Sequence, residues 1–200
     1  MKKIIASTIL AIASTGAVAA PMTMIDQGAN FDYQTLSTDL YTSPWDSIDY
    51  STFDFNTATG WSNGNAAFGN RPGDYTTYWA ADTDLALQTE FDFSGVASDL
   101  TLNVASDNGF VIFLNGTKIA QENDEGYTSY WEYTLNIDPS LLLQGSNSIQ
   151  VLAEDHGVLT FFDMKLSSSN VVASVPEPAT ITLLAAGLIG LSRIRRNKNG

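Results

Sequence analysis

The sequence predicts an all-β protein, a single jelly-roll or β-sandwich domain, and three observations support this fold class. Apolar and polar residues alternate with a period of two through several short segments, as expected for strands with one buried face. Clusters of glycine, asparagine and aspartate separate these segments and provide turn residues. Outside the two chain ends, no window longer than a turn or two has the period of a helix. Short strands joined by turns are typical of sandwiches and not of βαβ folds.

The predicted strands follow one another from residue 85 to residue 166. The clearest is residues 85–93, where leucine, threonine and phenylalanine alternate with more polar residues. Residues 110–114, with the sequence FVIFL, are apolar on both faces and predict a central strand. Asn115-Gly116 favours a type I′ turn that returns the chain through residues 117–120. Similar alternation predicts strands at residues 100–104, 133–137, 149–153 and 160–166, with a capped helical turn at residues 138–143.

The remaining segments set the predicted boundaries of the domain. Residues 21–60 are less regular, and their mixture of polar and aromatic residues predicts long loops with some edge strands. The polar stretch that begins Ser167-Ser168-Ser169-Asn170 predicts a linker. The expected organisation is a signal peptide (1–19), a β-sandwich domain (20–166), a linker (167–174) and a C-terminal sorting segment (175–200).

The N-terminus has the three parts of a secretory signal peptide. Lys2 and Lys3 provide the positive charge, residues 4–12 are largely apolar, and Ala17-Val18-Ala19 is an A-x-A cleavage site. A transmembrane helix needs about 20 apolar residues, and this segment has fewer. The sequence therefore predicts export, with cleavage after Ala19.

A short proline motif, Val175-Pro176-Glu177-Pro178, precedes an apolar run and a basic cluster at the C-terminus. The prolines keep the motif extended, residues 179–194 predict a transmembrane helix, and the basic residues would hold its end on the cytoplasmic side. This order resembles the PEP-CTERM sorting signal, which implies processing by an exosortase-type enzyme. The alternative is an ordinary hydrophobic anchor. The cluster consists of Arg193, Arg195, Arg196 and Lys198.

The length of the apolar run bears on that alternative. Residues 179–191 would be about 20 Å long as a helix, whereas the hydrocarbon core of a bilayer is about 30 Å thick. The run barely spans a membrane even when it is extended to residues 175–194. This length suits a temporary anchor, removed during processing, better than a permanent one.

The composition between the two ends is strongly acidic and excludes several classes of function. Residues 20–174 contain 21 acidic residues against three basic ones, a net charge of −18, which repels nucleic acid and anionic lipid. There is no cysteine and one histidine, His156, so cysteine chemistry and histidine-rich metal sites are excluded. Aromatic and β-branched residues are frequent enough to argue against disorder.

Three segments follow one another within residues 58–167: WSNGNAAFG at 61–69, a strand pair with an Asn-Gly turn after Asp107-Asn108-Gly109, and GSNSIQV at 145–151. Their order resembles that of galactose-binding-like jelly-roll domains. Such domains occur beside glycoside hydrolases and in many surface proteins, and their ligand sites vary from loop to loop. The resemblance implies a carbohydrate-binding module, in which Trp61 and Trp79 are structural.

Calcium is the metal that the sequence favours. Ca²⁺ binds six to eight oxygens, and jelly rolls of this kind often carry a structural calcium ion. Candidate ligands are Asp107 and Asn108, or Asp124 and Glu125, but no segment matches a D-x-[DN]-x-[DN]-G loop. The alternative is turn chemistry, in which such side chains bond their own backbone.

No residue pattern indicates catalysis. Glu90, Glu132 and Glu154 lie on or beside predicted strands, where we expect them to face solvent. His156 follows Glu154-Asp155, but no nucleophile motif accompanies it, and a turn is the simpler interpretation. We therefore expect a protein that is not an enzyme.

Aromatic side chains in a loop would form a platform for sugar rings, and Tyr127, Tyr130 and Trp131 are the candidates. The leading hypothesis is an exported, surface-sorted module that binds carbohydrate or organises the exopolysaccharide matrix. The alternatives are an acidic adhesion protein without a specific ligand and a polysaccharide-active enzyme. The expected partners are signal peptidase, an exosortase-type enzyme, a glycan and, before processing, the membrane; nucleic acid is not expected.

Overall fold

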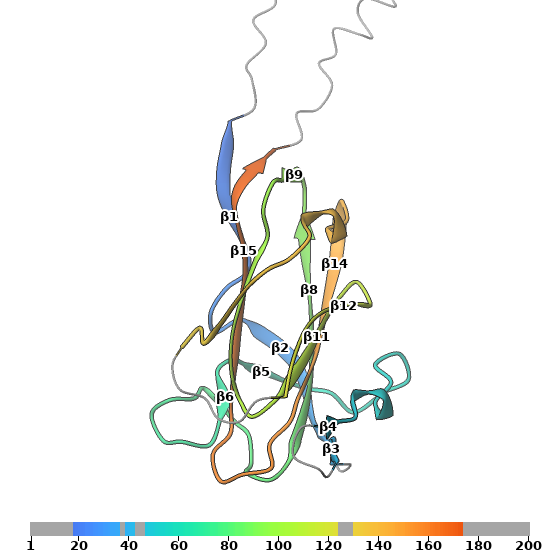
Figure 1. Ribbon diagram of the computed structural model, residues 1–200, viewed down its shortest axis with the longest axis vertical. Helices are drawn as coiled ribbons and strands as arrows, with labels where there is room; N and C mark the ends of the chain where they lie inside the picture. Colours follow the sequence, from blue (N-terminus) through green and yellow to red (C-terminus); the bar gives the residue numbers. More distant parts are fainter. Residues whose placement is uncertain (1–17, 37–38, 43–46, 124–129, 174–200) are drawn as a thin grey trace, which may run out of the picture. The chain divides into compact units, whose positions relative to one another are not determined.

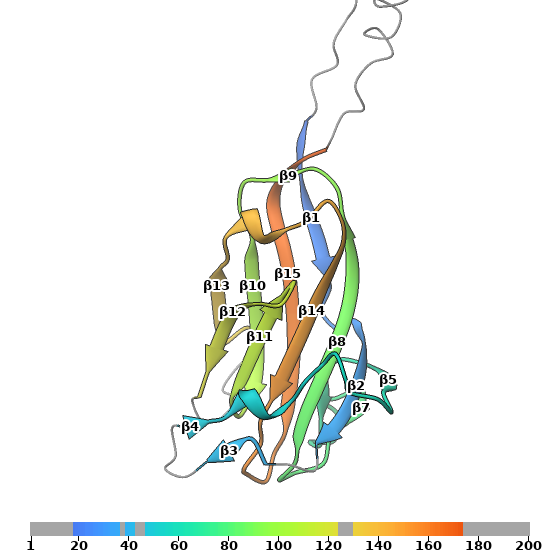
Figure 2. The same cartoon turned by 90° about the vertical axis from the view of Figure 1, so that its right-hand side faces the viewer.

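Two β-sheets, sheet A and sheet B, pack face to face across a hydrophobic core (Figures 1 and 2). The computed structural model describes residues 18–36, 39–42, 47–123 and 130–173. Residues Ala19–Val172 form one unit, which contains both sheets and the core between them. The protein is therefore all-β with the two-sheet arrangement of a sandwich, as the alternating pattern predicts.

Sheet A has seven strands among the described residues, in the order β13-β10-β15-β6-β7, with β1 and β9 also paired to β15. Every pair is antiparallel except β6 with β7, which is parallel. The long strand β15 thus pairs with most of the other strands of this sheet. The strands are β1 (Ala19–Ile25), β6 (Phe68–Gly69), β7 (Thr77–Tyr78), β9 (Val96–Ala97), β10 (Thr101–Asp107), β13 (Tyr133–Asn136) and β15 (Phe161–Val172).

Sheet B has six strands in the described part of the chain, in the order β12-β11-β14-β8-β2-β5, and all its pairs are antiparallel. Its strands are β2 (Asn30–Leu36), β5 (Ser62–Asn65), β8 (Asp84–Phe93), β11 (Phe110–Leu114), β12 (Thr117–Glu122) and β14 (Gly145–Ala153). A small third sheet pairs β3 (Tyr41–Thr42) with β4 (Ser47–Ile48), and the two single-turn helices are η1 (Tyr50–Thr52) and η2 (Pro139–Leu141).

Local sequence explains the elements that the pattern predicts. The FVIFL segment forms β11, and the turn to β12 places Asn115 and Gly116 at φ 52° and 76°, as a type I′ turn requires. Asp138 caps η2, because its side chain accepts a hydrogen bond from the backbone N–H of Ser140 at 2.9 Å. These elements confirm the predictions for residues 110–120 and 138–143.

The core lies between the inner faces of the two sheets. Alternate residues of each strand point into it, for example Phe162, Met164 and Leu166 of β15, all of which are fully buried. The largest buried side chains in this layer include Phe31 of β2 and Trp79, which follows β7. Trp79 is thus a structural residue, as expected.

A second, smaller hydrophobic cluster lies on the outer face of sheet B. Ala86, Val111 and Leu152 face away from the main core and are covered by side chains from the described parts of the segment between Leu40 and Trp61, residues 40–42 and 47–61. In Figure 2 this segment, with η1, crosses in front of the strands of sheet B. Among the described residues, a groove lies on the same face beside this covered cluster.

Two sequence expectations differ from the structure. Residues 21–60 contain β1 and β2, and β2 lies inside sheet B between β8 and β5, so it is not an edge strand. Residues 167–172, expected as a linker, belong to β15 and pair with β1 and β9. The physical reason is that the strand continues while its serines find partners: Ser168 is buried, and its hydroxyl donates to Asp99 at 2.6 Å.

The predicted signal peptide and the predicted C-terminal helix at 179–194 lie outside the described residues. No helix in the described ranges is long and apolar enough to cross a membrane.

Candidate functional site

A row of six side chains crosses the whole outer face of sheet B, one from each strand. The register places each member directly opposite the next, and in an antiparallel sheet opposite residues share a face. With strands about 4.8 Å apart, the row is about 24 Å long. We call it the cross-strand row; it runs Lys118, Phe113, Gln150, Gln88, Asp32 and Asn63.

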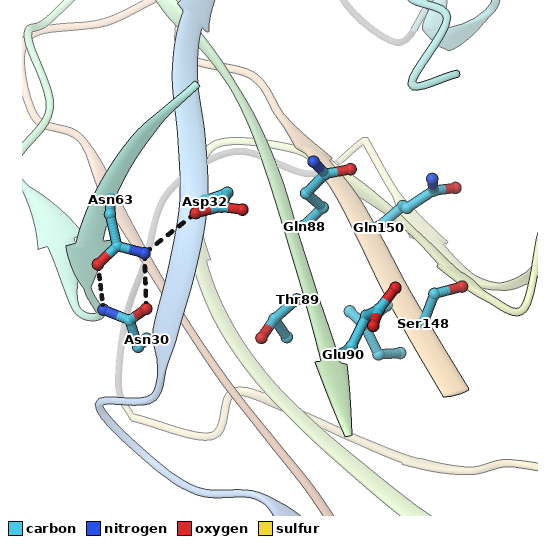
Figure 3. Close-up of a pocket in the computed structure, with 9 residues that line it drawn as sticks. Asn30, Asp32, Asn63, Gln88, Thr89, Glu90, Ser148 and Gln150 are labelled. Atoms are coloured by element: carbon cyan, nitrogen blue, oxygen red, sulfur yellow. Dashed lines mark hydrogen bonds between the residues drawn. The ribbon is translucent and has the colours of Figure 1, made fainter. Parts of the chain in front are cut away.

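A groove of about 610 Å³ opens over four of the six residues of this row, from Gln150 to Asn63. Figure 3 shows Gln88, Gln150, Ser148 and Glu90 projecting from β8 and β14 on one side, and the β2 and β5 side chains opposite them. The lining is almost entirely polar. It consists of Asn30, Asp32, Asn63, Gln88, Thr89, Glu90, Ser148, Ile149 and Gln150.

The β2–β5 side of the groove is held rigid by hydrogen bonds between side chains. Asn30 and Asn63 bond each other through both amides, with Asn30 Nδ2 donating at 2.9 Å and Asn63 Nδ2 donating at 2.7 Å (Figure 3). Asn63 Nδ2 also donates to Asp32 Oδ1 at 3.0 Å. This network fixes the carboxylate of Asp32 at the groove while leaving it exposed.

The amides in the centre of the groove have unused hydrogen-bonding capacity. Within the described part of the chain, the side chains of Gln88 and Gln150 make no hydrogen bond, although each offers two N–H donors and a carbonyl acceptor. Both side chains are half-buried at the base of the groove. A ligand with closely spaced hydroxyl groups could satisfy donors and acceptors together.

An aromatic pocket of about 320 Å³ adjoins the groove, and Gln150 lines both. The half-buried rings of Tyr50, Phe53, Phe55 and Phe113 lie around it. Together the groove and the pocket form a surface that is polar at one end and aromatic at the other. The remaining lining residues are Asp54, Asn56, Gly116 and Leu152.

The segment that carries these rings is fastened by its own aspartates. Asp49 caps η1 by accepting from the backbone N–H of Ser51 at 2.9 Å, and Asp54 accepts from that of Asn56 at 2.9 Å. Hydrogen bonds from Ser51 lower the pKa of Asp49, and those from Asn56 and Thr57 lower the pKa of Asp54. Both carboxylates thus stay ionised and hold the wall of the pocket in place.

The aromatic wall is also a packed cluster. Trp61 meets Phe53 edge-on at 6.1 Å and lies nearly parallel to Phe55 at 6.2 Å, while Phe53 and Phe55 pack edge-to-face at 4.8 Å. Trp61 also donates its indole N–H to the carbonyl of Ala58 at 3.2 Å. Its role in the described structure is support, as expected.

Buried acids anchor the start of the same segment. Asp84 accepts from the backbone N–H of Leu40 at 2.5 Å and from that of Asp155 at 3.1 Å. Burial raises the pKa of both Asp84 and Asp155 to about 6. Burial, with a smaller contribution from the nearby carboxylates, also raises the pKa of the Tyr50 hydroxyl.

Glu154 corrects one expectation, because it is completely buried and does not face solvent. Its Oε1 lies 2.6 Å from Nδ1 of His156, and the ring of Tyr41 stacks on His156 at 4.4 Å. Burial raises the pKa of Glu154, partly offset by the hydrogen bond to His156. These contacts tie β3 to the turn after β14, which is the structural role expected of His156.

The aromatic residues predicted to bind a ligand lie against the other sheet. Tyr130 packs edge-to-face on Phe161 of β15 at 5.3 Å and on Trp131 at 5.4 Å, and neither Tyr130 nor Trp131 lines the groove or the aromatic pocket. Tyr127 lies outside the described residues. The buried carboxylate of Asp163 is close by, and burial raises its pKa to about 6.

The predicted calcium ligands fall into two groups. Asn108 is buried in a turn, where its side-chain oxygen accepts from the backbone N–H of His156 at 3.2 Å, and Asp107 precedes it at the end of β10. Asp124 and Glu125 lie outside the described residues. In the ranges that the structure describes, no group of three or more acidic or histidine side chains is arranged to hold a metal ion.

Most groove residues were not among the sequence candidates. The alternation in residues 85–93 places Gln88 and Glu90 on the outer face. Asn30 and Asp32 lie in residues 21–60, predicted as loops with some edge strands, and Asn63 lies in the WSNGNAAFG segment at 61–69. The signal that could have found them is a set of amide and acidic residues at alternate positions of neighbouring strands. Only the register shows that these strands are neighbours.

Comparison with known families identifies a sorting motif near the C-terminus of the chain. The model of the PEP-CTERM protein-sorting motif matches residues 174–196. The chain therefore carries this motif, which marks an exported protein that is anchored in the membrane and then processed for the cell surface. The predicted motif, Val175-Pro176-Glu177-Pro178, and the basic residues Arg193, Arg195 and Arg196 fall within the match, and Lys198 follows it. All of them lie outside the described residues.

No curated protein matches the chain. Solved structures similar to it include sandwich regions of glycoside hydrolases. A β-glucuronidase from Ruminococcus gnavus in complex with D-glucuronic acid has a TM-score of 0.46 at 10% identity, covering 80% of this chain and 31% of that one. A β-D-mannosidase from Dictyoglomus thermophilum has a TM-score of 0.41 at 12% identity, covering 68% and 16%.

An α-L-rhamnosidase from Streptomyces avermitilis, complexed with L-rhamnose, has a TM-score of 0.35 at 19% identity, covering 44% of this chain and 8% of that one. The chain thus spans less than a third of the length of each of these enzymes.

Proposed function

We propose that this exported β-sandwich is a non-catalytic carbohydrate-binding protein of jelly-roll type, and that it binds glycan chains along the cross-strand row of sheet B. The single observation that carries the proposal is that row, where polar and aromatic side chains follow one another across six strands. Its length of about 24 Å suits a chain-like ligand better than a single small molecule.

The chemistry of the row matches the two faces of a sugar. Gln88 and Gln150 provide donors and acceptors for hydroxyl groups, and the half-buried ring of Phe113 provides an apolar surface for a pyranose face. The hydrogen-bonded amides of Asn30 and Asn63 hold the far end in place, which limits the entropy lost on binding. Such a site can bind a glycan without the acid–base pair that catalysis would require.

A surface-sorted protein meets polysaccharide in the extracellular matrix, so the location given by the sorting motif fits this activity. The expected partners are therefore an exosortase-type enzyme during processing and matrix glycan afterwards. An acidic adhesion protein without a specific ligand is the alternative, and a polysaccharide-active enzyme is a less favoured one.

The test uses residues 20–174, which contain the core and both sheets apart from Ala19, the first residue of β1. We expect this domain to bind at least one oligosaccharide from a panel of neutral, cationic and anionic glycans in isothermal titration calorimetry. Gln150→Ala and Phe113→Ala should each weaken that binding by about tenfold, because each removes a central contact. Gln27→Ala, at an exposed position of the β1–β2 loop, is the matched control and should leave binding unchanged.

Two results would contradict the proposal. One is an absence of binding to every glycan in the panel, which would favour the adhesion protein without a ligand. The other is glycan binding that is insensitive to Gln150→Ala and Phe113→Ala but is lost in Trp131→Ala, which would move the site to sheet A. Release of reducing sugar by the purified domain would favour the enzyme.

A further inference from the structure

We infer that the glycan is cationic: the groove end of the cross-strand row selects amino sugars, whose ammonium groups it binds through Asp32 and Glu90. This inference rests on the proposed function, because it assigns a ligand class to the same site.

The first observation is the charge of the groove. Of the described residues that line it, two are carboxylates, Asp32 and Glu90, and none is a cation. The other lining side chains are mostly amides and hydroxyls, which bind hydroxyl groups of any sugar and so do not discriminate by charge. Any charge preference of the groove therefore comes from these two acids.

The second observation is the spacing of the two acids. Gln88 lies directly opposite Asp32, and Glu90 lies two residues further along the same face of β8. Asp32 and Glu90 are thus diagonal neighbours on adjacent antiparallel strands, at about 7–8 Å. At that spacing, the two carboxylates can contact ammonium groups on two different parts of one chain.

The third observation is that both carboxylates are available. Asp32 Oδ1 accepts from an amide of Asn63, and Glu90 Oε2 accepts from the hydroxyl of Ser146 at 3.5 Å. Neither forms an ion pair in the described part of the chain, where the ion pairs are Arg71 with Asp74 and His156 with Glu154. An ammonium group would therefore meet an unneutralised carboxylate in a partly enclosed groove.

The opposite end of the row carries the contrasting charge. Lys118 lies beyond Phe113 at the β12 edge, where its ammonium group donates to Gln121 at 2.8 Å. An anionic chain that crossed the groove would be attracted only at that edge and repelled along β2 and β8. Polyuronates and sulfated glycans should consequently bind poorly, and amino-sugar polymers should bind with their ammonium groups over the β8–β2 end.

The experiment compares three hexasaccharides on residues 20–174 at low ionic strength: β-1,4-linked glucosamine, its fully N-acetylated form and oligogalacturonate. We expect the glucosamine chain to bind about tenfold more tightly than the acetylated chain, and oligogalacturonate to bind least. The preference should decrease as salt is added, since the carboxylates are exposed.

Variants identify the residues responsible. Asp32→Asn and Glu90→Gln should each reduce the glucosamine preference about threefold, and the double variant should abolish it while binding of the acetylated chain persists. Asp92→Asn is the matched control, because it removes one exposed carboxylate from the same strand outside the groove. It should leave the preference unchanged.

The outcomes separate this inference from the proposed function. Equal binding of the glucosamine and acetylated chains would overturn the amino-sugar assignment and leave the carbohydrate site intact. A preference reduced as much by Asp92→Asn as by Asp32→Asn would also overturn it, because the whole acidic domain and not the groove would be responsible. Binding to no glycan at all would remove the proposed function and this inference together.

Discussion

Gln150 lies at the junction of the polar groove and the aromatic pocket, with Gln88 on one side and Phe113 on the other. Its position follows from the pleat of β14, in which Ile149 and Val151 enter the core and Gln150 faces outward. One strand thus contributes both to the stability of the sandwich and to the surface of the site.

Asp163 allows the effect of burying a carboxylate on stability to be tested at a single residue. Its carboxylate is 1% exposed and accepts from the backbone N–H groups of Gly28 and Met164 at 3.3 and 2.8 Å, yet burial raises its pKa to about 6. Asp163→Asn keeps an oxygen acceptor and removes the buried charge. We expect the free energy of unfolding at pH 7.5 to increase by about 1 kcal/mol in urea denaturation.

The contrasting variant is Asp99→Asn. Hydrogen bonds from Ser168 and Ser169 lower the pKa of Asp99, so its ionised form is favoured in the folded state. Its replacement should decrease stability at the same pH. A stabilising Asp99→Asn, or a destabilising Asp163→Asn, would show that burial and hydrogen bonding do not act on these carboxylates as described.

At the scale of elements, the covering segment from Leu40 to Trp61 both closes a hydrophobic cluster and forms the wall of the aromatic pocket. Trp61→Ala should therefore lower the free energy of unfolding by about 2 kcal/mol and also weaken glycan binding, because the rings of Phe53 and Phe55 lose their support. Chemical denaturation and calorimetry measure the two effects.

Trp131→Ala is the control for Trp61→Ala. Trp131 packs on Tyr130, outside the groove and the aromatic pocket, so its loss should leave glycan affinity unchanged. If Trp131→Ala reduces affinity and Trp61→Ala does not, the loop aromatics predicted from the sequence form the site.

The elements also show which parts of the structure can be predicted from sequence. The strand at residues 110–114 and its Asn115-Gly116 turn are specified by residues close together in the chain, so local pattern is sufficient. Strand β2 lies in residues 21–60, for which the sequence predicts only loops with some edge strands. Its outer residues Asn30, Asp32 and Gln34 are polar as in other strands, but nothing in the local sequence shows that β2 pairs with a strand on each side. The groove depends on strands from Asn30 to Gln150 meeting in one register, which no local window contains.

At the scale of the whole molecule, buried acids determine how stability varies with pH. The pKa of Asp84, Asp155 and Asp163 is raised to about 6, against an ordinary value of about 3.9. Above pH 6 these carboxyl groups are ionised in both the folded and the unfolded state, and burial disfavours the ionised form in the folded state. Between pH 6 and about 4 the folded state binds protons more tightly, so acidification stabilises it.

We therefore expect the free energy of unfolding to rise by about 2 kcal/mol or more between pH 7.5 and pH 5. Below pH 4 it should fall, because Asp49, Asp54, Asp99 and Asp138 have lowered pKa values and lose their hydrogen bonds on protonation. Urea denaturation across this range measures both changes. A free energy of unfolding that declines steadily from pH 7.5 to pH 5 would contradict the raised pKa values of the buried aspartates.

The sorting motif makes a separate prediction for the whole chain. Processing at the motif should remove the basic tail, so the cell-surface form should lack Arg195 and Arg196, as intact mass spectrometry can show. A surface form that retains both arginines would indicate a permanent anchor.

The most direct test of the carbohydrate site is an NMR titration of residues 20–174 with the glucosamine hexasaccharide. The side-chain amides of Gln88, Gln150 and Asn63 are observable individually, and the backbone amides report on both sheets. Binding along the row predicts that these three side chains and the backbone around Phe113 shift together, while Tyr130, Trp131 and Phe161 do not. Shifts confined to sheet A, or no shifts with any glycan, would contradict the site on sheet B.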